Sequence, residues 1–224
     1  MATATRCRRF TPGSTSKRIT KVTRSIPSLT VGVRQTIRNA LIKTPVWIVC
    51  LLPLAMLLYG FKTNNLSANP IEYITHETGD WTLRILLVSL MITPLRRLGF
   101  PSLIRFRRLL GLFAFFYGCL HLATWAFLDQ GLDFPAMWAD VVKRRFITMG
   151  MFGLLLMVPL AVTSTKGWIR RLGKRWQQLH RLAYVSALAG VIHYYWLVKS
   201  DIRLPALYGA VLLLLLGFRV VKSK

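Results

Sequence analysis

The chain has 224 residues, of which 54% are hydrophobic and only 17% charged, and its formal net charge is +24. This apolar and aromatic content excludes disorder for most of the chain, because disordered segments are poor in both residue types. The composition also argues against a nucleic-acid binder, whose basic residues would cover a folded polar surface rather than separate apolar blocks. The three cysteines are too far apart for a disulfide framework, a zinc pattern or a CxxCH haem-attachment motif.

Residues 1–45 form a separate segment, rich in Ser and Thr, with ten basic residues and no acidic one. Nothing in it is apolar enough for the central region of a secretory signal peptide, so a cleaved signal is not expected. The composition is typical of an organellar transit peptide, or of a basic cytosolic tail lying on anionic lipid. Of the two, we expect a disordered basic cytosolic tail.

Six apolar blocks follow, each long enough to span or nearly span a hydrocarbon core about 30 Å thick. Only helices and closed barrels cross a membrane, and these blocks lack the apolar–polar alternation of barrel strands. The sequence therefore predicts an all-α integral membrane protein, a six-transmembrane-helix bundle over residues 46–220. The blocks run Val46–Phe61, Trp81–Leu95, Leu109–Leu128, Phe146–Ser164, Leu179–Val198 and Leu204–Phe218.

The charges of the loops and tails indicate an orientation for this bundle. The two tails and the loops on their side carry 24 basic residues and no acidic one, whereas the other side carries 7 basic residues and all 7 acidic ones. Positively charged loops stay in the cytosol, so the N- and C-termini are both predicted to be cytosolic.

Three of the four histidines fall inside these blocks, His121 in the third and both His180 and His193 in the fifth, while His76 falls in the first outer loop. Ionisable residues within a membrane are costly and suggest function, although a neutral histidine can simply hydrogen-bond across helices. From the helix rise, His121 and His193 lie at similar depth. Two imidazoles at one level on facing helices can hold one haem iron. The absence of CxxCH then favours non-covalent haem b.

Two further features bear on this haem hypothesis. Gly118 and Gly190 each precede a histidine by three residues, where a glycine lets a flat macrocycle lie against the backbone or, alternatively, lets helices pack closely. His180 precedes His193 by 13 residues, about 20 Å along a helix, which suits a site near the other membrane face. The two side chains point about 140° apart, so both face one interior only with a π-bulge or local unwinding.

Several runs of the sequence resemble the MsrQ family, the haem-binding membrane subunit of the bacterial periplasmic methionine sulfoxide reductase system. The runs RRLLGLFAFFYGCLHLATW, STKGWIRRLGKRWQQLHRLAY and VIHYYWLVK carry the resemblance around the three histidines. NPIEYITHETGDW and LVSLMITPLRRL match the second-helix region, so the resemblance covers roughly residues 45–220. It implies a ferric reductase-like architecture in the bacterial inner membrane.

The resemblance also implies cofactors, partners and site residues. It implies haem b bound through His121, His180 and His193, with FMN as a further cofactor. It implies electrons taken from quinol or a cytosolic flavin reductase. They would pass to a periplasmic molybdopterin-containing methionine sulfoxide reductase subunit that repairs oxidised proteins.

This chain departs from the larger superfamily, which holds two haems with two histidine pairs, because a fourth intramembrane histidine is missing. One haem is expected; a second would need His180 with a non-histidine partner, and His180 could instead serve a flavin or quinone site. His76 is either a haem-edge or docking residue or an ordinary loop histidine. Four basic residues lie near the cytosolic edge, Arg107, Arg108, Lys174 and Arg175. They could contact a haem propionate or a flavin phosphate, or they could serve only to set the topology.

The sequence contains no glycine-rich nucleotide fingerprint, HExxH or GxSxG motif. We therefore expect an electron-transfer subunit of an oxidoreductase without a complete catalytic site of its own. One alternative is ferric reductase-like electron transfer to another acceptor, which usually needs an attached flavin and nicotinamide domain that this chain is too short to hold. The other is a non-haem transporter or assembly factor with structural histidines, although no acidic residue lies within a span to relay protons.

Overall fold

A computed structural model describes residues 26–198 and 201–221, and every regular element in these ranges is helical. The chain divides into two compact units, Met1–Pro45 and Val46–Lys224. Helix α1 (Ile26–Lys62) begins in the first unit and ends in the second. Residues 26–45 of the segment expected to be a disordered tail are thus helical in this structure. Pro27 stands in the first turn, where proline is tolerated, and the residues after it include good helix formers; residues 1–25 of the expected tail lie outside the described residues.

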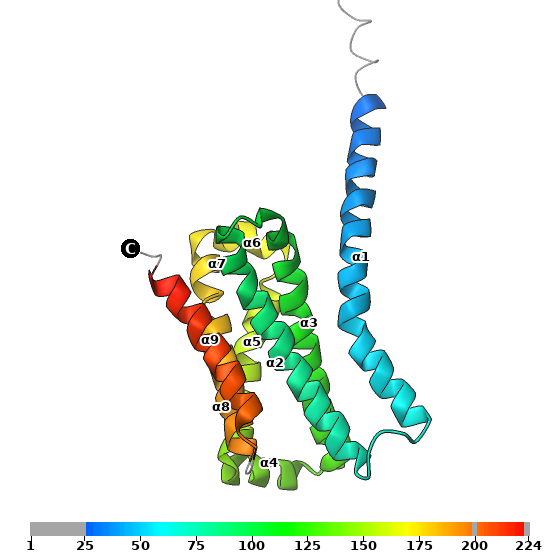
Figure 1. The fold of residues 1–224 in the computed structure, drawn as a ribbon, viewed down its shortest axis with the longest axis vertical. Helices are drawn as coiled ribbons and strands as arrows, with labels where there is room; N and C mark the ends of the chain where they lie inside the picture. The colour runs from blue at the N-terminus through cyan, green and yellow to red at the C-terminus, as the bar shows by residue number, and fades with distance from the viewer. Residues whose placement is uncertain (1–25, 199–200, 222–224) are drawn as a thin grey trace, which may run out of the picture. The chain divides into compact units, whose positions relative to one another are not determined.

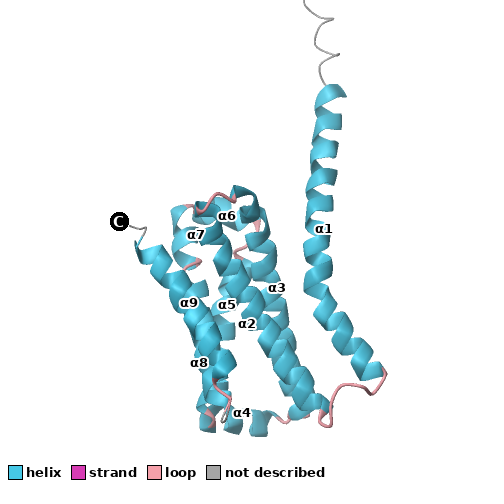
Figure 2. Ribbon diagram, in the orientation of Figure 1, coloured by secondary structure: helices cyan, strands magenta, loops and turns pink. Residues whose placement is uncertain are grey.

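The second unit is a helix bundle in which α2 (Pro70–Arg97), α3 (Ile104–Ala123), α5 (Arg145–Val162), α8 (Leu182–Leu197) and α9 (Arg203–Val221) lie side by side (Figures 1 and 2). Helix α2 packs mainly against α3, α5 packs mainly against α8, and α9 packs against α8 and α2. The core includes the fully buried side chains of Leu90, Tyr117 and Leu212. The Tyr117 hydroxyl donates a hydrogen bond of 2.7 Å to the Cys50 carbonyl and so joins α3 to the second half of α1.

Short helices cover the two ends of the bundle. Helix α4 (Phe134–Lys143) lies at one end, and α6 (Lys166–Leu172) and α7 (Lys174–Leu179) lie at the other (Figure 1). A 3₁₀ turn, η1 (Pro101–Leu103), precedes α3, and a π-helical segment, η2 (Thr124–Asp129), follows it. Gly173 separates α6 from α7 at a φ of +51°, a conformation that glycine adopts without a steric penalty.

The charged residues of the bundle are sorted between these two ends. The end at α4, here called the acidic end, receives all seven acidic residues, on the first half of α2, around α4 and just before α9. The end at α6 and α7, here called the basic end, receives the basic runs of residues 96–108 and 166–181 and also Arg219. The unequal distribution of charge between the two sets of loops in the sequence therefore corresponds to an unequal distribution of charge between the two ends of the bundle.

Among the residues that the structure describes, three helical segments have the length and apolar character to cross a membrane, Leu41–Lys62, Pro101–Asp129 and Arg145–Val162. The other three expected spans lie in α2, whose first half carries several charges, in α8, which has only 16 residues, and in α9. The count of six spans therefore stays a prediction. Large apolar side chains such as Tyr59, Leu213 and Leu214 are exposed on the helices, as a surface that faces lipid requires.

Two histidines lie on different elements from those expected. Helix α2 begins at Pro70 rather than near Trp81, so His76 lies on a helix and not in a loop. Asn69 caps this helix by accepting a hydrogen bond from the Glu72 amide, and Pro70 occupies the first turn. His180 lies in the turn between α7 and α8, because the fifth apolar block is interrupted there, and is not part of α8.

Candidate functional site

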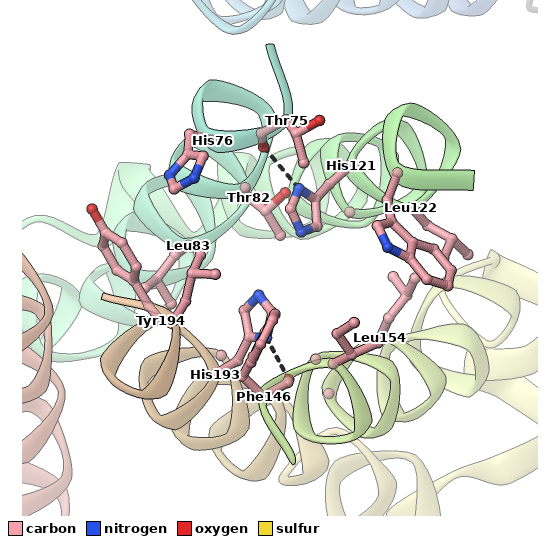
Figure 3. A pocket seen from close by; sticks show the side chains of 18 of the residues that line it. Thr75, His76, Thr82, Leu83, His121, Leu122, Phe146, Leu154, His193 and Tyr194 are labelled. Atoms are coloured by element: carbon pink, nitrogen blue, oxygen red, sulfur yellow. Dashed lines mark hydrogen bonds between the residues drawn. The ribbon is translucent and has the colours of Figure 1, made fainter. Parts of the chain in front are cut away.

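A cavity of about 550 Å³ opens between α2, α3, α5 and α8 toward the acidic end of the bundle (Figure 3). Its volume falls in the range of about 300–1,000 Å³ that is typical of ligand and cofactor pockets. Farther from the acidic end the wall is apolar and includes Leu86 and Met157. Most of the polar residues that line the cavity gather near the acidic end, so the cavity has a largely apolar interior and a polar mouth; they include Asn69, Glu72, His76, Asp80, Asp129 and Arg144.

His121 from α3 and His193 from α8 face each other across this cavity. Their ring centroids are 6.0 Å apart and the ring planes are inclined at 76°. Figure 3 shows the two rings on opposite walls, with the space of the cavity extending beside them. The structure thus brings together the two histidines that the depth estimate had placed at one level.

Each of these rings is held through Nδ1 by a backbone carbonyl of a neighbouring helix. His121 Nδ1 lies 2.9 Å from the Thr75 oxygen on α2, and His193 Nδ1 lies 2.6 Å from the Phe146 oxygen on α5. A carbonyl oxygen can only accept, so Nδ1 must be the protonated donor and Nε2 keeps a free lone pair. Figure 3 shows the second nitrogen of each ring directed into the space between the rings. Metal-binding histidines are commonly fixed in this way by a second hydrogen bond.

Two glycines provide the space in which these rings lie. A Cβ atom on Gly79 would come within 3.1 Å of the His121 ring, and one on Gly150 would come within 2.8 Å of His193 Nδ1. Each glycine follows the residue with the accepting carbonyl, Thr75 or Phe146, by four positions, one helical turn later. The pair α2–α3 and the pair α5–α8 therefore hold a histidine in the same manner. Neither Gly79 nor Gly150 was predicted from the sequence, because only the fold shows which glycine lies beside a histidine ring.

The two glycines that were identified from the sequence, Gly118 and Gly190, also line the cavity. A Cβ atom on Gly118 would come within 2.9 Å of the Leu154 side chain, and one on Gly190 would come within 3.4 Å of Leu83. Both leucines line the cavity as well. These two glycines thus allow close helix packing and at the same time keep the cavity wall open.

A π-helical turn extends the cavity wall beyond His121. Segment η2 begins three residues after this histidine, and its Trp125, Leu128 and Asp129 all line the cavity. A π-turn holds one more residue than an α-turn, which changes the direction of the side chains that follow, and such turns are frequent at functional sites.

His180 does not line the cavity. Its ring stacks on Trp176 at the basic end, with centroids 3.9 Å apart and an interplanar angle of 28°. His180 Nδ1 lies 3.1 Å from the Trp176 carbonyl oxygen, and the indole Nε1 of Trp176 donates to the Thr163 carbonyl at 3.0 Å. This group joins α7 to the end of α5 and lies apart from the His121–His193 pair.

The four basic residues considered for haem propionates or a flavin phosphate also lie at the basic end. Among the residues that line the cavity, none is Arg107, Arg108, Lys174 or Arg175. They stand at the start of α3 and on α7, at the opposite end from the mouth of the cavity. We therefore do not expect them to contact a group bound in this cavity. Arg107 is near enough to His180 for their charges to interact. Within the described part of the chain, the cation that lines the cavity is Arg144, which in the sequence is only one of the seven basic residues on the less basic side.

The residues present fit a haem. Two imidazoles that share one metal ion have centroids roughly 6 Å apart, because each metal–nitrogen bond is about 2 Å long and each ring adds about 1 Å. The two free Nε2 lone pairs and the apolar interior suit an iron within a flat, largely apolar macrocycle. In the described part of the chain no group of three or more His, Cys, Asp or Glu side chains could hold a metal ion by itself. Two protein ligands suit a metal whose remaining ligands come from the macrocycle.

Comparisons with known proteins identify the family of this chain. Residues 44–191 match the family described as the ferric reductase like transmembrane component. The chain is 48% identical over 190 residues to the protein-methionine-sulfoxide reductase heme-binding subunit MsrQ of Caulobacter vibrioides, which covers 84% of this chain and 90% of that protein. It is 52% identical over 188 residues to MsrQ of Rhodospirillum rubrum, covering 83% of this chain and 90% of the relative. No solved structure matches the chain. The chain therefore belongs to the MsrQ family, within the ferric reductase-like transmembrane proteins.

Proposed function

We propose that this chain is a b-type cytochrome that binds one haem between His121 and His193 and carries electrons across the inner membrane to a methionine sulfoxide reductase. The single observation that carries this proposal is the pair of facing imidazoles, each with Nδ1 fixed by a carbonyl and Nε2 free. The names of its relatives as heme-binding subunits support the same cofactor.

The residues around the cavity have distinct roles in this proposal. The Thr75 and Phe146 carbonyls fix the tautomer and the direction of the two ligands, while Gly79 and Gly150 let the rings approach those carbonyls. A haem held by two histidines supplies one-electron transfer and leaves no open iron position for a substrate. The apolar interior limits access of water, which contributes to the redox potential of such a group.

We place the entry of electrons at the basic end and their exit at the acidic end. The excess of Lys and Arg supports a cytosolic position for the basic end and for both termini. Quinol or a cytosolic flavin reductase would donate there, and an FMN phosphate would meet basic groups drawn from Arg107, Arg108, Lys174 and Arg175. The periplasmic molybdopterin-containing reductase subunit would dock at the acidic end, where His76 stands at the cavity mouth.

The proposal has six membrane crossings, three of them in α2, α8 and α9, which do not combine the length and the apolar character of the other three. Their packing beside α3 and α5 in one bundle supports the proposal. A reporter enzyme that is active only in the periplasm, fused after Lys224, should be inactive, and one inserted at Gly131 beside α4 should be active. The opposite result would reverse the orientation.

The absorption spectrum of the purified protein tests the proposed cofactor. We expect a reduced spectrum with a Soret band and a sharp α band, and a pyridine haemochrome assay should give one haem b per chain. Two haems per chain would assign His180 to a second haem. A chain that inserts in the membrane and purifies without haem would contradict the proposal and favour a transporter or assembly factor.

A further inference from the structure

The mouth of the cavity contains a cation, Arg144, that has no role in the function proposed above. The inference drawn from it rests on that proposed function. Arg144 is the one Lys or Arg residue among those that line the cavity in the described part of the chain. It is the residue before the first turn of α5, two positions before Phe146, whose carbonyl holds His193. The arginine is therefore fixed close to one of the two proposed iron ligands.

The guanidinium of Arg144 is held in place by one ion pair but still has hydrogen-bond donors available. Its Nε atom lies 3.2 Å from Asp140 Oδ1, an ion pair between α4 and the start of α5. An arginine side chain carries five N–H donors, and this contact uses the one on Nε, so the four on the terminal nitrogens remain for another acceptor. The side chain is 55% exposed, as expected for a group at the rim of a cavity.

Two of the acidic residues at the mouth are already engaged by neighbours of their own. Glu72 accepts a hydrogen bond of 3.0 Å from Asn69 and lies 3.9 Å from His76 Nε2, and Asp80 pairs with Arg84 at 2.9 Å. A carboxylate that enters the mouth therefore meets Arg144 as its available cationic partner. Arginine binds carboxylates with two parallel N–H donors, a geometry that favours this pairing over a simple point charge.

The opposite end of the cavity cannot accept such a group. Leu86 and Met157 line it, and a carboxylate buried against these side chains without a partner would be strongly disfavoured. Haem b is an apolar macrocycle with two propionate carboxylates on one edge. We propose that Arg144 binds the propionate carboxylates of the haem, so that this edge faces the mouth of the cavity at the acidic end.

Comparing haem b with its dimethyl ester, which lacks the carboxylate charges, tests the proposal. The full-length protein would be produced in haem-deficient cells, placed in lipid nanodiscs and titrated with each compound. We expect wild type to bind the ester about tenfold more weakly than haem. Arg144→Gln should lose this discrimination, Arg144→Lys should keep part of it, and Arg145→Gln should behave as wild type. Arg145 is the matched control because it is the next residue, is exposed and does not line the cavity.

The midpoint potential provides a second readout that does not depend on activity. Reduction removes one positive charge from the iron, so loss of a nearby cation disfavours the reduced form. If Arg144→Gln shifts the equilibrium tenfold toward the oxidised form, the potential falls by about 59 mV. Arg145→Gln should leave it unchanged.

The outcomes separate this inference from the proposed function. Equal binding of haem and its ester by wild type would overturn the role of Arg144 while leaving the two histidine ligands in place. So would an Arg144→Gln protein whose potential and discrimination match those of Arg145→Gln. A wild type that binds neither compound with a six-coordinate spectrum would overturn the proposed function itself. Should Arg144→Gln fail to insert, the ester titration of wild type and the Arg144→Lys variant still decide the question.

Discussion

His193 and His180 stand on neighbouring stretches of the chain, but their surroundings differ in one decisive respect. His193 Nδ1 bonds to a carbonyl on another helix, 47 residues away in the sequence, and its ring faces a cavity. His180 Nδ1 bonds to the carbonyl four residues before it, and its ring stacks on the same Trp176. One ring is directed into the cavity by a carbonyl of another helix, whereas the other lies at the basic end and bonds to a carbonyl of its own turn.

The difference shows how the fold directs the two histidines that we propose as iron ligands. A ring held by a second helix has its free nitrogen directed relative to the whole bundle, and the same arrangement repeats at His121. The His180 ring is held at the basic end, where Trp176 joins its turn to the end of α5, and it does not line the cavity. His121 and His193 thus form a pair, whereas His180 has no counterpart across a cavity.

Replacing the paired histidines should have the largest effect. We expect His121→Ala and His193→Ala each to remove most of the b-type absorbance and nearly all electron transfer, because each removes an axial ligand. The double variant should be little worse than either single variant, since groups that act as a unit are strongly non-additive. The measurements are haem per protein and the low-spin spectrum of each purified variant.

His180→Ala is the contrast within this series. With one haem in the cavity it should keep most of the spectrum while reduction from the basic end is impaired. The pairing is wrong if His121→Ala keeps a six-coordinate low-spin spectrum while His180→Ala and His193→Ala both abolish it.

Filling the space beside one ring should have the next largest effect. In Gly150→Ala the new Cβ atom would lie 2.8 Å from His193 Nδ1, so the ring must move away from the Phe146 carbonyl. We expect roughly a tenfold loss of haem affinity, about 1.4 kcal/mol, which is a usual size for losing a partner of a metal ligand. Gly79→Ala, with contacts of 3.1 Å at His121, should show a smaller loss in the same titration.

Gly111→Ala is the matched control for these variants. Gly111 also lies within a helix, α3, but a Cβ atom there meets nothing within 4 Å. It should bind haem as wild type does, and replacing an interior helix glycine by alanine should slightly stabilise the fold. Equal haem affinity in Gly150→Ala and Gly111→Ala would show that the glycines do not position the rings.

Parts of this architecture are readable from the sequence because apolar length is a strong signal. The fourth block was expected at Phe146–Ser164 and the helix α5 runs Arg145–Val162. The first half of α2 was missed because it is polar, although the cap formed by Asn69 and Pro70 marks its start. The turn at His180 was missed because the local sequence QLHRL contains neither glycine nor proline.

The candidate site was likewise predictable from the sequence only in part. Helix rise alone placed His121 and His193 at one depth, and the structure has their rings facing each other. The carbonyls that hold them could not be predicted, because every residue has a carbonyl and its availability depends on where a neighbouring helix packs. Arg144 was likewise hidden, since only the fold distinguishes it from its basic neighbours Lys143 and Arg145, which do not line the cavity.

A change at the basic end should affect stability but not the haem spectrum. Trp176→Phe keeps a ring for His180 to stack on but loses the indole donor to the buried Thr163 carbonyl. We expect a loss of about 0.5–1.5 kcal/mol. That loss corresponds to a thermal midpoint lower by roughly 2–4 °C for each kcal/mol, measured in detergent. Loss of half the haem absorbance in this variant would instead point to a second haem at His180.

The smallest effect should come from removing the N-terminal segment. The described residues that line the cavity lie between Asn69 and Leu197, within the second unit. A chain that begins at Leu41 keeps the apolar segment Leu41–Lys62, which is long enough to cross a membrane. It should insert and retain its full haem content per membrane-bound protein. Lower yield would be consistent with this expectation, because nine of the ten basic residues of the tail are removed and the topology signal is weakened. A truncated protein that inserts and lacks haem would show that the site depends on a part of the chain outside the bundle.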